Sequence, residues 1–241
     1  MTQTIAIVIP AFNEAESIGQ VVRELRALDA GRIIVVDGGS SDGTPDIVRA
    51  AGGEALEVGR GYGLACLKGA EAAAGSEIIV FMDGDGADNP AFLASLVDPI
   101  LRDEQDFTIG SRVRGRAEPG SMSWRQKLAG LIFGLAAKFA CGQRYTDMCA
   151  FRAIRRATLL RLGMQEMTYG WNLEMQLRAG RAGLRILEIP VDNRQRIGGE
   201  SKVSGNLRGT WNAGRKIIAA FVRFVMDRSE GGAKDAAGAR S

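Results

Sequence analysis

Short apolar runs alternate with helix-like stretches through the first 110 residues, and this alternation limits the possible fold more than any other feature of the chain. Four runs have the length and continuous hydrophobicity of buried parallel strands, at residues 5–9, 33–36, 77–82 and 106–109. Helical spacing or a helix-opening proline occurs between them, at residues 14–28, from Pro45, and at 64–74 and 90–101. The alternation predicts an α/β fold with a mixed, mostly parallel sheet and helices on both faces.

The second half of the chain is less regular. Helices are expected over residues 122–140, 171–181 and 204–227, and a strand over 184–189. The polar, Gly- and Ala-rich end is expected to be disordered. We therefore predict one domain over residues 1–205, a basic amphipathic helix over 206–228 and a disordered tail over 229–241.

The chain contains no histidine, which excludes a histidine base and histidine metal ligands. A catalytic metal would be held by oxygen ligands, which favours Mg²⁺ or Mn²⁺. The three cysteines lack metal-ligand spacing and are expected to be buried, reduced thiols. The chain opens on a strand-like run and has no uninterrupted apolar stretch of 18 residues, so we expect a cytoplasmic protein without a transmembrane helix.

Charge is distributed unevenly along the chain. Residues 1–110 have a net charge of −11, and residues 111–241 have a net charge of +14. This asymmetry indicates a metal-binding half followed by a half that meets phosphates or an anionic surface. Nucleic acid is not an expected partner, because the sequence has no helix-turn-helix, zinc-finger or RNA-binding aromatic signature.

Two acidic loops follow predicted strands, where ligands bind in open α/β sheets. Asp83-Gly84-Asp85 places two carboxylates at the end of an apolar run, and such a pair can hold one Mg²⁺ together with substrate phosphates and water. Asp37 begins a Gly- and Ser-rich loop up to Asp42 that suits a nucleotide pocket, although a plain βα turn would have the same composition. Gly59-Arg60-Gly61-Tyr62-Gly63 lacks the dinucleotide-binding spacing but leads into a helix whose N-terminus could face phosphate.

Four motifs in order resemble those of glycosyltransferase family 2, which has the GT-A fold. They are Pro10-Ala11-Phe12-Asn13-Glu14, the stretch from Val35 to Thr44, Asp83-Gly84-Asp85, and Gly110-Ser111-Arg112. Within the family, the chain looks most like the dolichyl-phosphate mannose and undecaprenyl-phosphate sugar synthases. That likeness rests on the stretches from Thr146 to Ala153 and from Gly170 to Met175, and on the basic loop from Arg194 to Lys202.

The resemblance implies a role for each matching residue. Pro10, Phe12, Glu14 and Asp37 would contact the nucleoside, while Asp83 and Asp85 would hold the metal on the diphosphate. The residues expected to hold phosphate or acceptor are Arg112, Arg194, Arg196, Ser201 and Lys202. Asp85 and Arg112 would take part in catalysis, and Asp147 and Glu174 are the candidate bases for a hydroxyl acceptor.

The sequence departs from the pattern of such synthases at two positions. Ala87 stands where many have Gln, so metal coordination would rely more on water or on Asp88. Phe12 replaces the usual Tyr, which keeps a stacking ring but removes its hydroxyl.

The resemblance implies a metal-dependent hexosyltransferase that moves sugar from a UDP- or GDP-linked donor to a polyprenyl phosphate, with inversion. An ionised acceptor phosphate can attack without a strong base. A family 2 enzyme with a soluble hydroxyl acceptor is the nearest alternative. A nucleotidyltransferase or a non-catalytic nucleotide-binding module would share the α/β sheet and the acidic loops.

Residues 194–228 contain eight basic and two acidic residues, interspersed with aromatic and aliphatic ones. A basic amphipathic helix of this kind can lie on the anionic inner face of the cytoplasmic membrane as a peripheral attachment. Packing on the domain or on a second subunit of a homo-oligomer is the alternative. The apolar run 128–140 is expected to be a core helix, with an interfacial role as its alternative.

Overall fold

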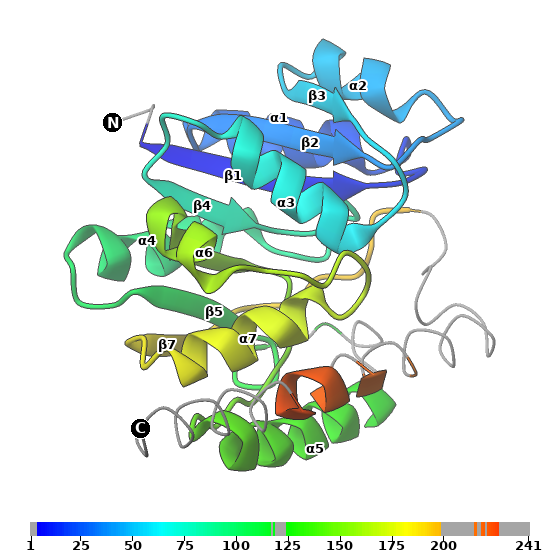
Figure 1. Ribbon diagram of the computed structural model, residues 1–241. Coiled ribbons are helices and arrows are strands. Elements are labelled where there is room, and N and C mark those ends of the chain that lie inside the picture. Colours follow the sequence, from blue (N-terminus) through cyan, green and yellow to red (C-terminus); the bar gives the residue numbers. More distant parts are fainter. Residues whose placement is uncertain are drawn as a thin grey trace, which may run out of the picture.

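A computed structural model describes residues 4–116, 118, 124–198, 215, 218–219 and 221–226, without the side chains of 124–129 and 131. Within these residues, seven strands form one sheet in the order β3-β2-β1-β4-β6-β5-β7 (Figure 1). The strands are β1 Ile5–Ala11, β2 Arg32–Asp37, β3 Glu54–Glu57, β4 Ile78–Phe81, β5 Phe107–Ser111, β6 Arg152–Arg155 and β7 Ile186–Pro190. The expected tail over 229–241 and most of the expected helix over 206–228 lie outside the described residues, so the domain division stays a prediction.

All neighbouring strands are parallel except β6, which runs antiparallel to both β4 and β5. The centre of the sheet is excluded from solvent, because Ile7, Val8 and Ile9 of β1 and all four residues of β4 are fully buried. Continuous hydrophobicity is what strands covered on both faces require. The predicted mixed, mostly parallel sheet is therefore confirmed.

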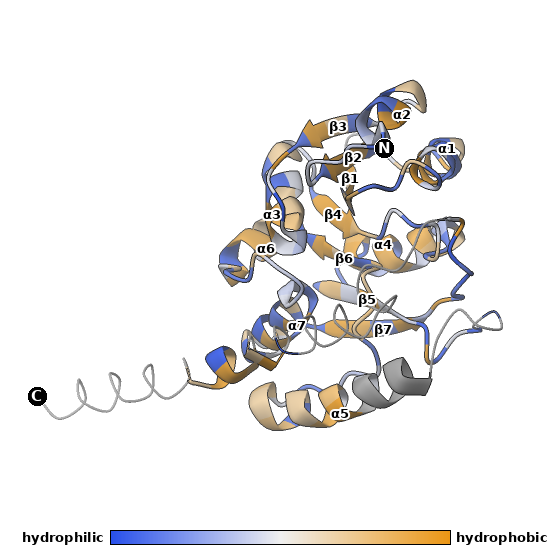
Figure 2. Cartoon of the chain, turned by 90° about the vertical axis from the view of Figure 1, so that its right-hand side faces the viewer, coloured by the Kyte–Doolittle hydropathy of each residue, from blue (hydrophilic) through white to orange (hydrophobic). Residues whose placement is uncertain are grey.

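Helices cover both faces of the sheet, as predicted. They are α1 Ile18–Ala27, α2 Thr44–Ala50, α3 Tyr62–Ala72, α4 Leu93–Leu101 after the short 3₁₀ turn Pro90–Phe92, α5 Trp124–Cys141, α6 Arg156–Leu162 and α7 Trp171–Arg181. Figure 2 shows α1 and α4 on one face and α3, α6 and α7 on the other. The helix expected from residue 14 begins only at Ile18, because Glu14 accepts bonds from Ser17 N and Ile18 N in a turn that holds the preceding loop.

Helix α5 lies outside the two layers and packs on α7, next to the helical segment 221–226 (Figure 1). Phe133 and Ala137 of α5 are buried, whereas Ile132, Leu135 and Phe139 are exposed. The expected core helix is therefore half buried and has an apolar outer face. Among the described residues, no helix is both long and apolar enough to cross a membrane.

Candidate active site

The Asp83–Asp85 loop lies at the end of β4, the position that its sequence predicted. Asp88 Oδ2 accepts a bond from Asp83 N at 2.9 Å, and Asp85 Oδ1 accepts one from Ala87 N at 2.9 Å. Gly86 has a φ of 81°, and a Cβ there would lie 2.3 Å from Ile197 Cδ1. The loop is thus built around its own carboxylates and is covered by the segment 194–198.

Carboxyl groups crowd together at this loop. Burial, together with the carboxylates of Asp88 and Asp85, raises the pKa of Asp83 to about 8. Burial raises the pKa of Asp88 as well. A divalent cation at this place would remove the repulsion that keeps these carboxylates from ionising together.

The donor set fits a Mg²⁺ or Mn²⁺ ion that is shared with substrate. Asp83 and Asp85 offer hard oxygen ligands, and Mg²⁺ usually takes one or two protein carboxylates plus phosphate oxygens and water. Within the described residues, no group of three or more His, Cys, Asp or Glu side chains is placed to hold a metal ion by itself. Water or the oxygens of a bound diphosphate could complete the coordination of an ion at this loop.

Two predicted arginines follow β7, and one of them, Arg196, reaches the acidic loop. Arg196 Nη2 lies 3.3 Å from Asp85 Oδ2 and 3.4 Å from Glu14 Oε1. Arg194 instead pairs with Glu24 Oε2 at 2.9 Å and donates to Asn89 Oδ1 at 2.7 Å. In the described part of the chain, Arg196 Nε is buried without a hydrogen-bond partner. A buried donor without a partner is costly, so this nitrogen is suited to an anionic ligand.

Arg112 and Asp147 form a two-point ion pair behind the loop. The Nε and Nη2 atoms of Arg112 each donate to the Asp147 carboxylate at 2.8 Å, and its backbone N donates at 3.0 Å. Asp147 is only 4% exposed, and Glu188 accepts bonds from both N and Oγ1 of the preceding Thr146. Paired N–H donors fix the plane of a guanidinium. Asp147 therefore orients Arg112, whose positive charge partly offsets the rise in the pKa of Asp83 and of Asp88.

The opening motif and the Asp37 loop are bonded to each other. Asp37, 1% exposed, accepts bonds from Gly39 N at 2.9 Å, from Ser40 N at 2.8 Å and from Ser40 Oγ. Asn13 N donates to Ser40 Oγ at 2.7 Å, and Glu14 N donates to Thr44 Oγ1 at 3.0 Å. Pro10 lies opposite Val36 in the β1–β2 ladder. These bonds make the two motifs one rigid rim rather than two separate turns.

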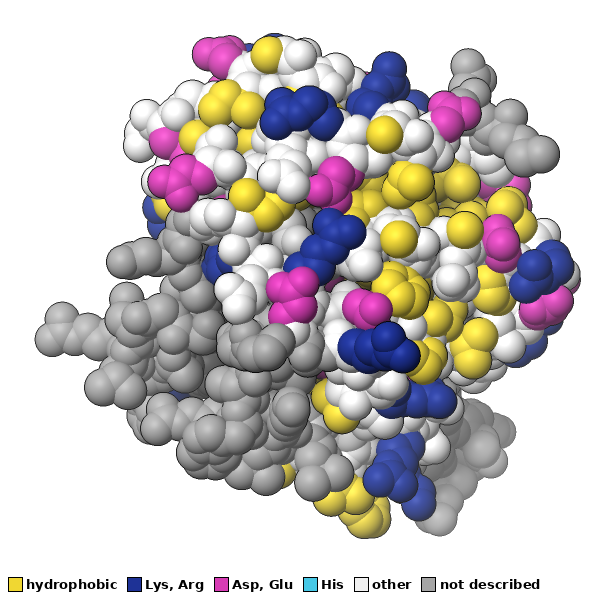
Figure 3. All heavy atoms as spheres, turned by 180° about the vertical axis from the view of Figure 1, so that it is seen from behind, with side chains coloured by type: hydrophobic (Ala, Val, Ile, Leu, Met, Phe, Trp, Pro, Cys, Tyr) yellow, Lys and Arg dark blue, Asp and Glu magenta, His cyan; other side chains and the backbone are white. Residues whose placement is uncertain are grey.

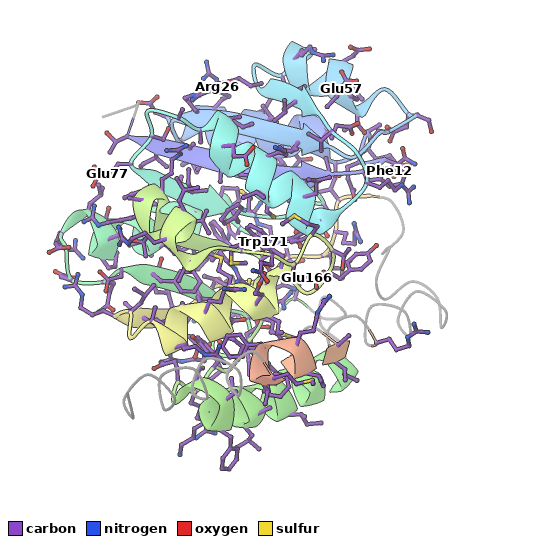
Figure 4. The ribbon with its side chains drawn as sticks, in the orientation of Figure 1. Phe12, Arg26, Glu57, Glu77, Glu166 and Trp171 are labelled. Carbon is purple, nitrogen blue, oxygen red and sulfur yellow. The ribbon has the colours of Figure 1, made fainter. Side chains whose placement is uncertain are left out.

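Phe12 stands at the outer edge of this rim, where Figure 4 labels it. The guanidinium carbon of Arg60 lies 3.7 Å from the centre of its ring. Arg60 was not among the predicted site residues. The glycine-rich stretch that contains it was considered as a phosphate-facing helix start, but only the fold brings it against Phe12.

Glu174 lies apart from the acidic loop. It is 7% exposed and accepts bonds from Gln165 N, from Glu166 N at 2.7 Å and from Arg178 Nε at 2.7 Å. Glu174 thus fixes the loop that precedes α7. Ser201 and Lys202, the remaining predicted residues, lie outside the described residues.

A pocket of about 230 Å³ opens beside the acidic loop. It is lined by Asn89, Arg116, Glu118, Asp192, Asn193 and Arg194. Its two arginines come from the segments after β5 and β7, both in the basic half of the chain. The pocket is open, its lining residues are all polar or charged, and two of them, Asn89 and Arg194, bond to each other close to the predicted metal carboxylates.

Comparisons with known proteins bear on the family and the fold. Residues 6–163 match the sequence profile described as Glycosyl transferase family 2. The chain is 33% identical to the undecaprenyl-phosphate mannosyltransferase of Micrococcus luteus, over 84% of this chain and 88% of that protein. It is 30% identical to the polyprenol monophosphomannose synthase of Mycolicibacterium smegmatis, over 95% of this chain and 91% of that protein.

A solved structure with a similar fold is glucosyl-3-phosphoglycerate synthase from Mycobacterium tuberculosis, in complex with Mn²⁺, UDP-glucose and phosphoglyceric acid. The TM-score is 0.71, and the match covers 92% of this chain and 79% of that one at 23% identity. At this identity the likeness bears on the fold alone.

Proposed function

The chain belongs to glycosyltransferase family 2 and has the GT-A fold, and from that premise we propose that it moves a hexose from a UDP- or GDP-linked donor to a polyprenyl phosphate with inversion. The names of two relatives at 30% identity or more support a polyprenyl acceptor. The observation that carries the proposal is the meeting of the Asp83–Asp85 loop with Arg196 and the Arg112–Asp147 pair.

On the donor side, the proposal gives Pro10, Phe12, Glu14 and Asp37 to the nucleoside, and Asp83 and Asp85 to Mg²⁺ or Mn²⁺. A bound ion would supply Lewis-acid stabilisation of the leaving diphosphate. Arg112 and Arg196 would add fixed positive charge where the leaving group becomes more negative. The bonds between the two nucleoside motifs support a preformed donor pocket, since they hold the rim in place without ligand.

On the acceptor side, the hydrogen bonds that the two candidate bases already accept favour a phosphate acceptor over a hydroxyl acceptor. Asp147 is occupied by Arg112, and Glu174 by two backbone N–H groups and Arg178. A hydroxyl acceptor needs a carboxylate free to take its proton, whereas an ionised phosphate does not. We therefore propose Asp147 and Glu174 as positioning residues, and Arg194, Ser201 and Lys202 as ligands of the acceptor phosphate.

We also propose that the protein meets its acceptor as a peripheral protein on the inner face of the cytoplasmic membrane. Exposed apolar side chains recur on one side of α5 at Ile132, Leu135 and Phe139, and Phe139 is 84% exposed. Figure 3 shows hydrophobic and basic side chains together at the lower end of the molecule, where α5 runs in Figure 1. An apolar strip among basic groups suits an anionic bilayer surface.

The test is transfer of label into the organic phase. Purified full-length protein is incubated with undecaprenyl phosphate, Mg²⁺ or Mn²⁺ and radiolabelled UDP- and GDP-sugars, and butanol-extractable label is counted. We expect label from one donor, its loss with EDTA, and at least a 100-fold loss in Asp85→Asn. Asp98→Asn, an exposed carboxylate on α4, is the matched control and should keep full activity.

Two results would overturn the proposal. Turnover of donor onto a soluble hydroxyl acceptor, with no label in butanol, would assign the alternative acceptor class. Full activity of Asp85→Asn in EDTA would remove the metal role and leave a family 2 transferase that works without a cation.

A further inference from the structure

Tyr62, at the start of α3, reaches the predicted metal loop. Its hydroxyl donates to Asp83 Oδ1 at 3.3 Å, and Asn172 Nδ2 of α7 lies 3.5 Å from the same hydroxyl. The phenol is thus a hydrogen-bond donor to one of the two Asp83 oxygens. That bond restricts rotation of the Asp83 carboxylate. Oδ1 accepts the bond from Tyr62, so Oδ2 is the oxygen that we expect to face the cation.

The backbone around Tyr62 is held by close packing against the loop 163–170. A Cβ on Gly63 would lie 2.0 Å from Glu166 O, and one on Gly61 would lie 2.6 Å from Met167 O. Leu64 N donates to Met167 O at 3.0 Å. Glycine is required at both positions because the two backbones approach this closely. The place of Tyr62 is thus set by the position of residues 166 and 167.

The loop 163–170 is held in turn by the C-terminal helical segment 221–226. Glu166, 8% exposed, accepts bonds from N and Oγ1 of Thr168 through Oε1 and forms an ion pair with Arg223 through Oε2. Arg181 of α7 stacks over the ring of Phe224 at 3.5 Å and donates to Phe224 O at 2.8 Å. Figure 4 labels Glu166 near the beginning of α7, and Arg223 reaches it from this segment.

We propose that Tyr62 is a positioning residue for the metal carboxylate Asp83, and that segment 221–226 sets the place of Tyr62 through Arg223 and Glu166. The connection runs from Arg223 to Glu166, through the backbone of residues 166 and 167 to Gly61 and Gly63, and from Tyr62 to Asp83. It rests on the proposed function, because Asp83 is taken as a metal ligand. Its consequence is that a helical segment next to α5 acts on cation binding at the Asp83–Asp85 loop.

Mn²⁺ binding measures this connection directly. Free Mn²⁺ is counted by electron paramagnetic resonance during titration of the full-length protein with saturating UDP or GDP, so that neither acceptor nor turnover is needed. Tyr62→Phe keeps the ring and removes the hydroxyl, and we expect its Mn²⁺ dissociation constant to rise about tenfold, as for other residues that orient metal ligands. Arg223→Ala should raise it about threefold or more.

The control and the rescue separate positioning from general damage. Arg215→Ala, an exposed arginine near the same segment, should bind Mn²⁺ as the wild type does. Arg223→Lys keeps the charge opposite Glu166 and should restore most of the affinity. Thermal midpoints without metal show how far each variant is destabilised, and all titrations are run well below the lowest midpoint.

A double variant tests whether the two residues act in series. If Arg223 acts through Tyr62, Tyr62→Phe combined with Arg223→Ala binds Mn²⁺ no more weakly than Tyr62→Phe alone. Independent, multiplying effects would overturn the connection. Unchanged Mn²⁺ affinity in Tyr62→Phe would overturn the positioning role while leaving the proposed transferase intact. Absence of Mn²⁺ binding by the wild type, with butanol label still formed in EDTA, would overturn this inference and the metal role together.

Discussion

Single residues at the sheet edge fall into two groups. Asp147 and Glu174 are carboxylates that accept several hydrogen bonds each. Asp147 holds the Arg112 guanidinium, and Glu174 holds the backbone of the loop before α7. Asp83 and Asp88 are carboxylates in excess of nearby positive charge, with pKa values raised by burial. The first group accounts for rigidity in the absence of ligand, and under the proposed function the second group would attract a cation.

Asp147→Asn tests the first group at the residue level. The amide cannot accept two bonds from Arg112, so the guanidinium loses its fixed plane, and a misplacement of this kind can cost about 100-fold in rate. We expect kcat to fall by about that factor, with an unchanged shape of the pH–rate profile, measured by label transfer. If Asp147 is instead the catalytic base, the variant's profile loses its acidic limb. Asp46→Asn, exposed on α2, is the control.

The elements differ in how far their sequences predict them. Continuous apolar runs predicted β1, β2 and β4, and helical spacing predicted α7 over 171–181. The sequence analysis missed β3, β6 and α6. Strand β3 is the polar edge segment Glu54–Glu57. Strand β6 contains Arg152, whose side chain can be completely buried because it donates hydrogen bonds to Cys149 O and Asn172 O. Hydrophobic pattern does not reveal a strand whose burial depends on partners elsewhere.

The same limit applies to the candidate site. The loops after β1, β2 and β4 were predicted because each motif is local and follows an apolar run. Tyr62, Arg60 and Glu188 were missed, since their contacts lie 21 or more positions away in the chain. A glycine-rich stretch was the only sequence signal near Tyr62 and Arg60. The exact partner of a polar side chain depends on the fold, which spacing alone does not supply.

The edge of the sheet offers a pH test at the element level. Asp106 precedes β5 and accepts bonds from N, Nε and Nη2 of Arg185, which precedes β7. The Arg185 guanidinium lowers the pKa of Asp106 below its usual 3.8. A lowered folded-state pKa stabilises the fold above about pH 4, and that contribution is lost as pH falls through the folded-state value.

Asp106→Asn should therefore lower the thermal midpoint at pH 7 by about 2–4 °C, a modest effect because both groups are partly exposed. The difference from wild type should begin to shrink below about pH 4 and should approach zero only once the pH lies below the folded-state pKa of Asp106. Scanning calorimetry at pH 7, 5, 3.5 and 2.5 measures it. A difference that does not shrink between pH 5 and 2.5 would mean that packing, rather than charge, holds this pair of strands.

At the scale of the whole molecule, apolar surface gathers at one end. Helix α5 exposes Ile132, Leu135 and Phe139, and the neighbouring C-terminal segment exposes Ile218, Val222 and Met226. These side chains recur at helical spacing on two helices that lie together (Figure 1). An exposed apolar surface of this kind suits either a bilayer or a second copy of the chain.

Phe139→Asp distinguishes these partners. We expect wild type to sediment with vesicles that contain phosphatidylglycerol and the variant to bind them at least fivefold more weakly, because a charge replaces an inserted ring. Leu160→Asp, 45% exposed on α6 in the wild type, should bind normally. If vesicle binding is the same for all three proteins and only Phe139→Asp dissociates an oligomer in analytical ultracentrifugation, the surface is a subunit interface.

The position of strand β6 determines where the sheet can separate locally into two parts. Strands β3, β2, β1 and β4 form an all-parallel block, while β5 and β7 form a second pair, and in the described sheet β6 alone is hydrogen-bonded to both groups. Local opening follows such boundaries between cooperative units. The amides of the β4–β6 ladder are therefore the ones whose hydrogen–deuterium exchange reports separation of the two blocks. Asp83 lies just beyond β4 and Arg112 just beyond β5, so the same seam sets how far the carboxylate and the guanidinium can drift apart between turnovers.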